Sequence, residues 1–139
     1  MTTVCRSYLA ILSLYHVFTG VVSFAFPGFA IRFYKALYAC APAEQRQLKL
    51  VMKPWGALAI FAGLAGGFAA IDPARYWGVV VALWILLVLR IVFRLGWRSE
   101  LVEVGRIPPY RNIFSAAIIA AGAVILGIWL GGFLVFNIN

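Results

Sequence analysis

Four long apolar segments, separated by more polar connections, constrain this chain more than any other feature of its sequence. A membrane-spanning helix needs about 20 consecutive apolar residues, and none of the four segments contains an acidic residue. Lipid offers no partner to a free backbone N–H or C=O group, so each segment is expected to be an α-helix. The predicted spans cover about 7–26, 54–71, 76–95 and 113–136. We therefore predict an all-α polytopic membrane protein, a single domain over residues 1–139 whose four transmembrane helices form a compact bundle.

The composition agrees with a membrane protein and excludes an ordinary soluble domain. Hydrophobic residues make up 65% of the chain and charged residues 12%, whereas about a quarter of a soluble domain is charged. The net charge is +8, but the basic residues lie between the apolar segments or near their ends, where lipid phosphates are the expected contact. We therefore expect membrane lipids as partners, with other membrane subunits or further copies of the chain, and no nucleic acid.

The basic residues are divided unequally between the two sides of the predicted bundle. Four spans place both termini and the 72–75 turn on one side, which holds only Arg6 and Arg75. The other side holds ten basic residues: Arg32, Lys35, Arg46, Lys49, Lys53, Arg90, Arg94, Arg98, Arg106 and Arg111. Basic loops remain in the cytoplasm. The sequence therefore predicts cytoplasmic loops at 27–53 and 96–112 and outside termini, in a bacterial inner membrane.

Residues 1–25 allow one alternative to this topology. Arg6, an apolar stretch and Ser23-Phe24-Ala25 match the pattern of a secretory signal peptide, whose removal would leave three spans. That arrangement would export the basic first loop, against the positive-inside rule, so a first membrane span is the favoured interpretation. With four spans, Cys5 and Cys40 lie on opposite faces and cannot form a disulfide.

Several residues mark the expected helix boundaries. Residues 29–41 (FAIRFYKALYACA) combine aromatic and basic side chains, which is typical of an amphipathic helix lying in the membrane interface. Pro42 is suited to open a second helix that runs through Pro54, with a kink, into the second span. Asp72 is the expected N-cap of the third span, and Asn112 that of the fourth.

Small residues spaced four apart predict two helix-packing faces. Helices in lipid associate through close backbone approach, and the second span offers Gly63 and Gly67 while the fourth offers Gly127 and Gly131. Packing within one bundle is the favoured interpretation. The alternative is that one face contacts another subunit, with the fourth span as the better candidate. The third span is bulky, so much of it is expected to face lipid.

His16 is the only histidine, and it lies in the first apolar segment. It shares one helical stripe with Ser13 and Gly20, so its side chain is expected to point into the bundle. An ionisable residue inside a membrane is a functional candidate by default. The favoured interpretation is a neutral imidazole with a structural hydrogen bond to a neighbouring helix. The more specific interpretation is a ligand-binding set made of His16, Tyr15, Thr19 and Arg90. No metal site is predicted, because a metal needs several ligands.

Arg90, Arg94 and Arg98 recur every four residues at the end of the third span. Like charges at this spacing repel each other on a helix, so an anion is expected nearby. The simpler interpretation is a basic collar whose side chains snorkel to the interface. The more specific interpretation is a pocket for an anionic lipid head group.

The predicted spans contain few side chains that could act in catalysis, and no catalytic residue is predicted. The four acidic residues, Glu44, Asp72, Glu100 and Glu103, all lie outside the apolar segments. No carboxylate pair or oriented triad can therefore form within the membrane. The residues themselves call for no cofactor, although a Tyr15–His16 pair could donate hydrogen bonds to a quinone carbonyl, so a bound quinone or lipid is compatible with the sequence.

Residues 56–90 read GALAIFAGLAGGFAAIDPARYWGVVVALWILLVLR. A glycine-rich span, a tight turn and a bulky span follow one another, and Thr19-Gly20 stands in the span before them. This order is similar to that of the DoxX-like four-helix membrane proteins. The resemblance implies a compact four-helix bundle and, for some members, association with membrane redox or quinone-linked systems. It carries over no catalytic residues.

Two classes of function follow as expectations. The first is a non-catalytic subunit or scaffold of a larger membrane assembly, which fits the missing chemistry and the small-residue faces. The second is a lipophilic-ligand or quinone-binding module of a membrane redox system. A small transporter or an intramembrane enzyme is a further alternative, although neither an internal repeat nor an intramembrane acid supports it.

Overall fold

A computed structural model describes residues 1–33, 42–103 and 107–138. Every regular element in these ranges is helical, and four helices are long and apolar enough to cross a membrane. The fold is therefore the predicted all-α polytopic membrane protein. The elements are α1 (Thr2–Ala25), α2 (Pro27–Phe33), α3 (Pro42–Ile71), α4 (Trp77–Gly96), α5 (Arg98–Glu103) and α6 (Pro109–Ile138).

Helices α1, α3 and α6 begin well before the predicted spans, whereas α4 is displaced by a single residue from its predicted span. The apolar helices capable of crossing a membrane are Thr2–Ala25, Arg46–Ile71, Trp77–Gly96 and Pro109–Val135. Hydropathy alone ends a span at the first cluster of polar residues, but a helix continues wherever its backbone hydrogen bonds can continue. Helix α3 shows this best, because it runs unbroken through Pro54, as the sequence predicts.

The two predicted N-caps have other roles. Oδ1 of Asp72 accepts a hydrogen bond from the backbone N–H of Arg75 at 3.2 Å, so it caps a separate turn, and α4 begins only at Trp77. Helix α6 already begins at Pro109, because proline fits a first helical position whose N–H needs no partner. Asn112 therefore lies inside α6 and does not cap it, which makes both predicted caps wrong.

The first connection contains a short helix close to where an interfacial helix was predicted. Helix α2 follows α1 directly, and its Ala30 and Ile31 are buried with Met52 of α3. The rest of the predicted 29–41 helix lies outside the described residues from position 34 on. The part that is described packs against the bundle through an apolar face.

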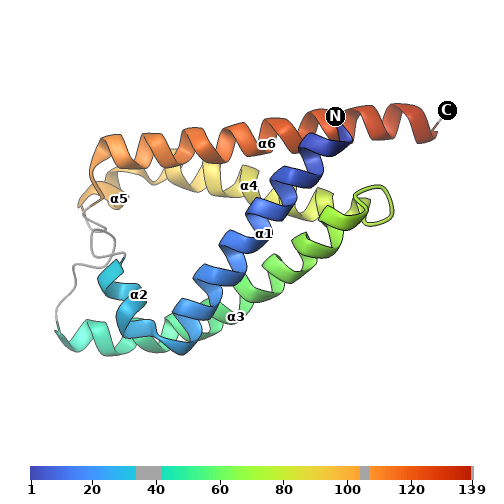
Figure 1. The fold of residues 1–139 in the computed structure, drawn as a ribbon. Helices are drawn as coiled ribbons and strands as arrows, with labels where there is room; N and C mark the ends of the chain where they lie inside the picture. Colours follow the sequence, from blue (N-terminus) through green and yellow to red (C-terminus); the bar gives the residue numbers. More distant parts are fainter. Residues whose placement is uncertain (34–41, 104–106, 139) are drawn as a thin grey trace.

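The long helices form two pairs. Helices α1 and α3 contact each other most extensively, followed by α4 and α6, and the contacts between the pairs are fewer. We call α1 and α3 the first pair and α4 and α6 the second pair. Figure 1 shows that the pairs converge at the end that holds both termini and the α3–α4 turn, the closed end, and diverge toward the end that carries α2 and α5, the open end.

The first pair is held by contact between backbones. A Cβ atom added at Gly20 would lie 2.7 Å from the carbonyl oxygen of Gly56, and one at Gly63 would lie 2.7 Å from the backbone nitrogen of Val17. The hydroxyl of Ser13 donates a hydrogen bond to the carbonyl oxygen of Gly63 at 2.6 Å. Glycine is therefore required where α1 and α3 cross, as in other close helix contacts in lipid.

The second pair is held by side chains. The indole Nε1–H of Trp84 donates to the carbonyl oxygen of Ala123 at 3.0 Å, and Gly127 leaves room for the ring. Near the open end, Arg94 and Asn112 are joined by two hydrogen bonds. Trp84 therefore faces α6, although the bulk of this span led us to expect lipid.

The core lies at the closed end, where all four long helices meet. Its largest fully buried side chains are Leu9, Val80, Leu87 and Leu126, one or more from three of these helices, and Ala69 of α3 is buried among them. Tyr8 of α1 packs onto Gly122 of α6, where an added Cβ would displace the Tyr8 ring. The packed closed end fixes the pairs relative to each other, so the open end has space between them.

Candidate ligand-binding site

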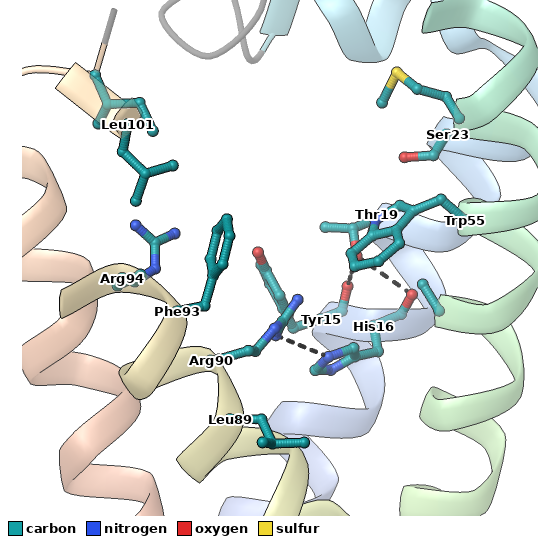
Figure 2. Close-up of a pocket in the computed structure, with 13 residues that line it drawn as sticks. Tyr15, His16, Thr19, Ser23, Trp55, Leu89, Arg90, Phe93, Arg94 and Leu101 are labelled. Atoms are coloured by element: carbon teal, nitrogen blue, oxygen red, sulfur yellow. Dashed lines mark hydrogen bonds between the residues drawn. The ribbon is translucent and has the colours of Figure 1, made fainter. Parts of the chain in front are cut away.

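A cavity of about 540 Å³ lies between the two pairs toward the open end. Its volume is within the usual range for a small-molecule pocket. Figure 2 shows side chains of α1 on one side of it and side chains of α4 on the other. The lining residues are Tyr15, His16, Thr19, Ser23, Met52, Trp55, Ala59, Leu89, Arg90, Phe93, Arg94, Leu101 and Ile107.

His16 is held in one tautomer by its own helix. Its Nδ1 lies 2.8 Å from the carbonyl oxygen of Leu12, which can only accept, so Nδ1 carries the proton. Its Nε2 lies 3.3 Å from Nη1 of Arg90, and because a guanidinium can only donate, Nε2 is the acceptor. The imidazole is therefore neutral and buried, with 4% of its surface exposed, and it orients the side chain of Arg90 (Figure 2).

Arg94 is oriented from the other side by Asn112. Nη1 of Arg94 donates to Oδ1 of Asn112 at 3.0 Å, while Nδ2 of Asn112 donates to the backbone carbonyl of Arg94 at 2.9 Å. Asn112 is almost fully buried, with 1% of its surface exposed. Because both ends of this amide are used, the guanidinium of Arg94 is attached to α6 while it lines the cavity.

The hydroxyl groups of α1 add polar atoms to the cavity wall. Thr19 donates its proton to the carbonyl oxygen of Tyr15 at 2.8 Å, so its oxygen can still accept a hydrogen bond from a ligand. Ser23 is buried on the same side. Tyr15 packs edge-on against His16, with 5.3 Å between the ring centroids, and half of its side chain is exposed.

The charge of the cavity is positive. Arg90 and Arg94 both line it, and none of the described residues that line it is acidic. Glu100, on α5, is fully exposed and accepts a hydrogen bond from the hydroxyl of Ser99 at 2.9 Å. A hydrogen bond from its own backbone N–H, and then the one from Ser99, lower the pKa of Glu100, so it stays ionised outside the cavity and does not neutralise the two arginines.

The structure brings together the four residues predicted to bind a ligand. His16, Tyr15 and Thr19 come from α1 and Arg90 from α4, and all line the one cavity. The predicted anionic-lipid cluster is divided, because Arg94 lines the cavity whereas Arg98 is exposed at the start of α5 and lines a separate hollow with Glu103.

The glycines of the two predicted packing faces have different surroundings. Gly63 lies against the backbone of α1, and Gly67 faces the hydroxyl of Ser13. Gly127 lies against Trp84, whereas a Cβ added at Gly131 would meet no heavy atom within 4 Å. The C-terminal part of α6 is thus open at Gly131.

Sequence reasoning missed several residues of the site. Ser23 lies on the helical stripe of His16 by its spacing, but the predicted ligand-binding set did not include it. Met52, Trp55 and Phe93 are apolar residues in apolar helices, so nothing in the sequence distinguishes them from residues that face lipid. Asn112 was assigned to a helix cap because the sequence does not reveal that Arg94 lies beside it.

Comparison of the chain with protein-family models, curated proteins and solved structures yields no match. The DoxX-like resemblance therefore stays a prediction, and the site is interpreted from its own residues.

Proposed function

We propose that this protein is an integral membrane module that binds a lipophilic ligand between its two helix pairs. The observation that carries the proposal is the Arg90–His16 pair, which faces a cavity of about 540 Å³ lined mostly by apolar side chains. Ligand pockets combine an apolar lining with a few placed polar groups in this way. The polar groups fix a head group, and the apolar wall accepts a tail.

A quinone is one ligand that this arrangement supports. Its carbonyl oxygens need donors, and Arg90, Arg94 and the hydroxyl of Tyr15 supply them at the cavity wall. The DoxX-like resemblance points the same way, since some members of that family are linked to quinone systems. A membrane redox system is the setting in which such a module would act.

The proposed topology places the open end in the cytoplasm of a bacterial cell. Arg94 lies in the last turn of α4, Arg98 begins α5, and the first turns of α3 carry further basic residues, so the positive-inside rule supports it. Both termini then lie outside. A reporter that is active only in the cytoplasm, fused after Asn139, is expected to be inactive, and an active fusion would reverse the orientation.

A second candidate is a non-catalytic subunit or scaffold of a larger membrane assembly. The open surface around Gly131 and Gly132 favours it, because neither glycine has a neighbour within 4 Å of an added Cβ. Small residues of this kind allow another helix to approach closely in lipid. A subunit of this kind could also carry the ligand site.

The decisive test is native mass spectrometry of the protein extracted gently from its own membrane. We expect a reproducible small-molecule mass on the wild-type chain. Ala59→Phe fills the cavity and is expected to remove that mass, whereas Ala57→Phe, the same change on an exposed position of the same helix, retains it. Equal loading of both variants, or a bare wild-type chain, would contradict ligand binding. Added protein mass in fixed stoichiometry would favour the subunit.

A further inference from the structure

We infer that the ligand is an anionic amphiphile whose phosphate or carboxylate head lies between Arg90 and Arg94. This inference rests on the proposed ligand-binding function and names the chemical class of the ligand. It differs from a neutral quinone in one property, the negative charge of the head group.

The first reason is uncompensated charge. Arg90 lies six residues before Gly96, the end of α4, or about 9 Å along the helix axis. An arginine keeps its proton under all ordinary conditions, and a charge at this depth is tolerated only with a partner or with water. The partner given to Arg90 is the neutral His16, and that of Arg94 is the neutral Asn112. Both positive charges therefore persist in the cavity.

The second reason is geometry. Residues four apart on a helix lie on the same face, separated by about 6 Å along the axis. Each guanidinium is bound through Nη1 to a different helix, Arg90 to α1 and Arg94 to α6. An arginine has five N–H donors, so each retains others for a ligand. Two oriented guanidinium groups at this spacing can bind the oxygens of one phosphate or carboxylate from two sides.

The third reason is the character of the remaining wall. Met52 and Trp55 of α3 and Leu89 and Phe93 of α4 present apolar surface to the same cavity. A free inorganic anion would leave this surface unused, whereas an acyl or isoprenoid tail would bury it, at about 25 cal/mol for each Å² of apolar surface removed from water. Head and tail together define an amphiphile.

His16 is the positioning residue of this site. A carboxylate at position 16 would also orient Arg90. However, its negative charge would neutralise the positive charge of Arg90, which attracts the anionic head group. The Nε2 lone pair of a neutral imidazole holds the guanidinium and leaves its charge in place. His16 therefore acts on the ligand through Arg90.

The test compares four probes by titration calorimetry on the intact protein in a neutral maltoside detergent. Dioctanoyl phosphatidic acid supplies the anionic head with a tail. Dioctanoyl phosphatidylcholine supplies the same tails with no net charge, decylubiquinone supplies a neutral head, and inorganic phosphate supplies an anion without a tail. We expect phosphatidic acid to bind at least tenfold more tightly than each of the other three.

Variants then locate the site. Arg90→Gln and Arg94→Gln are expected to weaken phosphatidic acid binding about tenfold to a hundredfold, the value of a charge-assisted hydrogen bond. Arg98→Gln is the matched control, because it removes the same charge from an exposed position outside the cavity, and it should leave binding unchanged. His16→Leu should weaken binding, and His16→Gln, whose amide oxygen can still accept from Arg90, should restore it.

The remaining outcomes separate this inference from the proposed function. Equal binding of phosphatidic acid and decylubiquinone, both lost in Ala59→Phe, would overturn the anionic head and leave the ligand module intact. Displacement by inorganic phosphate at the same concentration would make the ligand a free anion and overturn the amphiphile. Binding of none of the four probes would overturn the inference, and a bare chain in native mass spectrometry would overturn the module as well. Equal losses in the Arg94 and Arg98 variants would show a general surface-charge effect and overturn the site.

Discussion

The two helix pairs differ in the kind of contact that holds their helices together. In the first pair, glycines let two backbones touch, so the interface between α1 and α3 depends on the absence of side chains. In the second pair, Trp84 and Asn112 reach across to the other helix, so the interface between α4 and α6 depends on the presence of side chains. A backbone contact cannot yield to an added atom, whereas a side-chain contact can rearrange. The two pairs should therefore differ in their sensitivity to substitution.

The largest effect is expected for Gly63→Val in the first pair. The added side chain would begin 2.7 Å from the backbone nitrogen of Val17 and 2.9 Å from the carbonyl oxygen of Ser13, and neither atom can move without its helix. We expect a loss of about 3 kcal/mol, the upper end of overpacking effects. Unfolding by sodium dodecyl sulfate in mixed micelles, followed by tryptophan fluorescence, measures it. Wild-type stability would refute the backbone contact.

A smaller loss is expected for Asn112→Leu in the second pair. The change keeps the size of the side chain but removes both hydrogen bonds to Arg94. Hydrogen bonds between helices in membranes are weak on average, so we expect about 1–2 kcal/mol, measured by the same unfolding titration. A double-mutant cycle with Arg94→Met should show coupling between the two positions. Additive effects would mean that the two side chains act independently.

Trp84→Phe probes one hydrogen bond of the second pair. Phenylalanine retains most of the ring but cannot donate to the carbonyl oxygen of Ala123. The expected loss is about 0.6 kcal/mol, the average for such bonds in membrane proteins. Trp97→Phe, at an exposed position, is the control that corrects for the loss of a fluorophore. A loss as large as that of Gly63→Val would remove the distinction between the pairs.

The smallest effect is expected for Gly131→Val. It is the same change as Gly63→Val, but a Cβ at this position meets no heavy atom within 4 Å. Stability should change by less than about 0.5 kcal/mol, as for other substitutions away from contacts. If the variant is stable but loses a protein partner in native mass spectrometry, the open part of α6 is a subunit interface.

The sequence predicts the four spans and the end of the bundle at which basic residues are concentrated. Both predictions use only the hydropathy and the charge of each segment, which do not depend on how the helices pack. It also predicts that His16 shares a stripe of the first span with Ser13 and Gly20, since helical spacing decides that. It does not predict that α1 pairs with α3 or that Asn112 lies beside Arg94, because these depend on how the helices cross. Gly20 and Gly56 illustrate the limit, since each appears as one more small residue until the other is placed against it.

The order of the pairs along the chain bears on how the protein is made. Helices α1 and α3 are both complete before residue 72, and α4 and α6 both follow residue 76. Each long helix therefore packs mainly against the span that is synthesised directly before or after it. The contacts within each pair join residues that are close in the sequence. Membrane insertion can accordingly proceed as two successive hairpins, with the turn at 72–76 as the boundary between them.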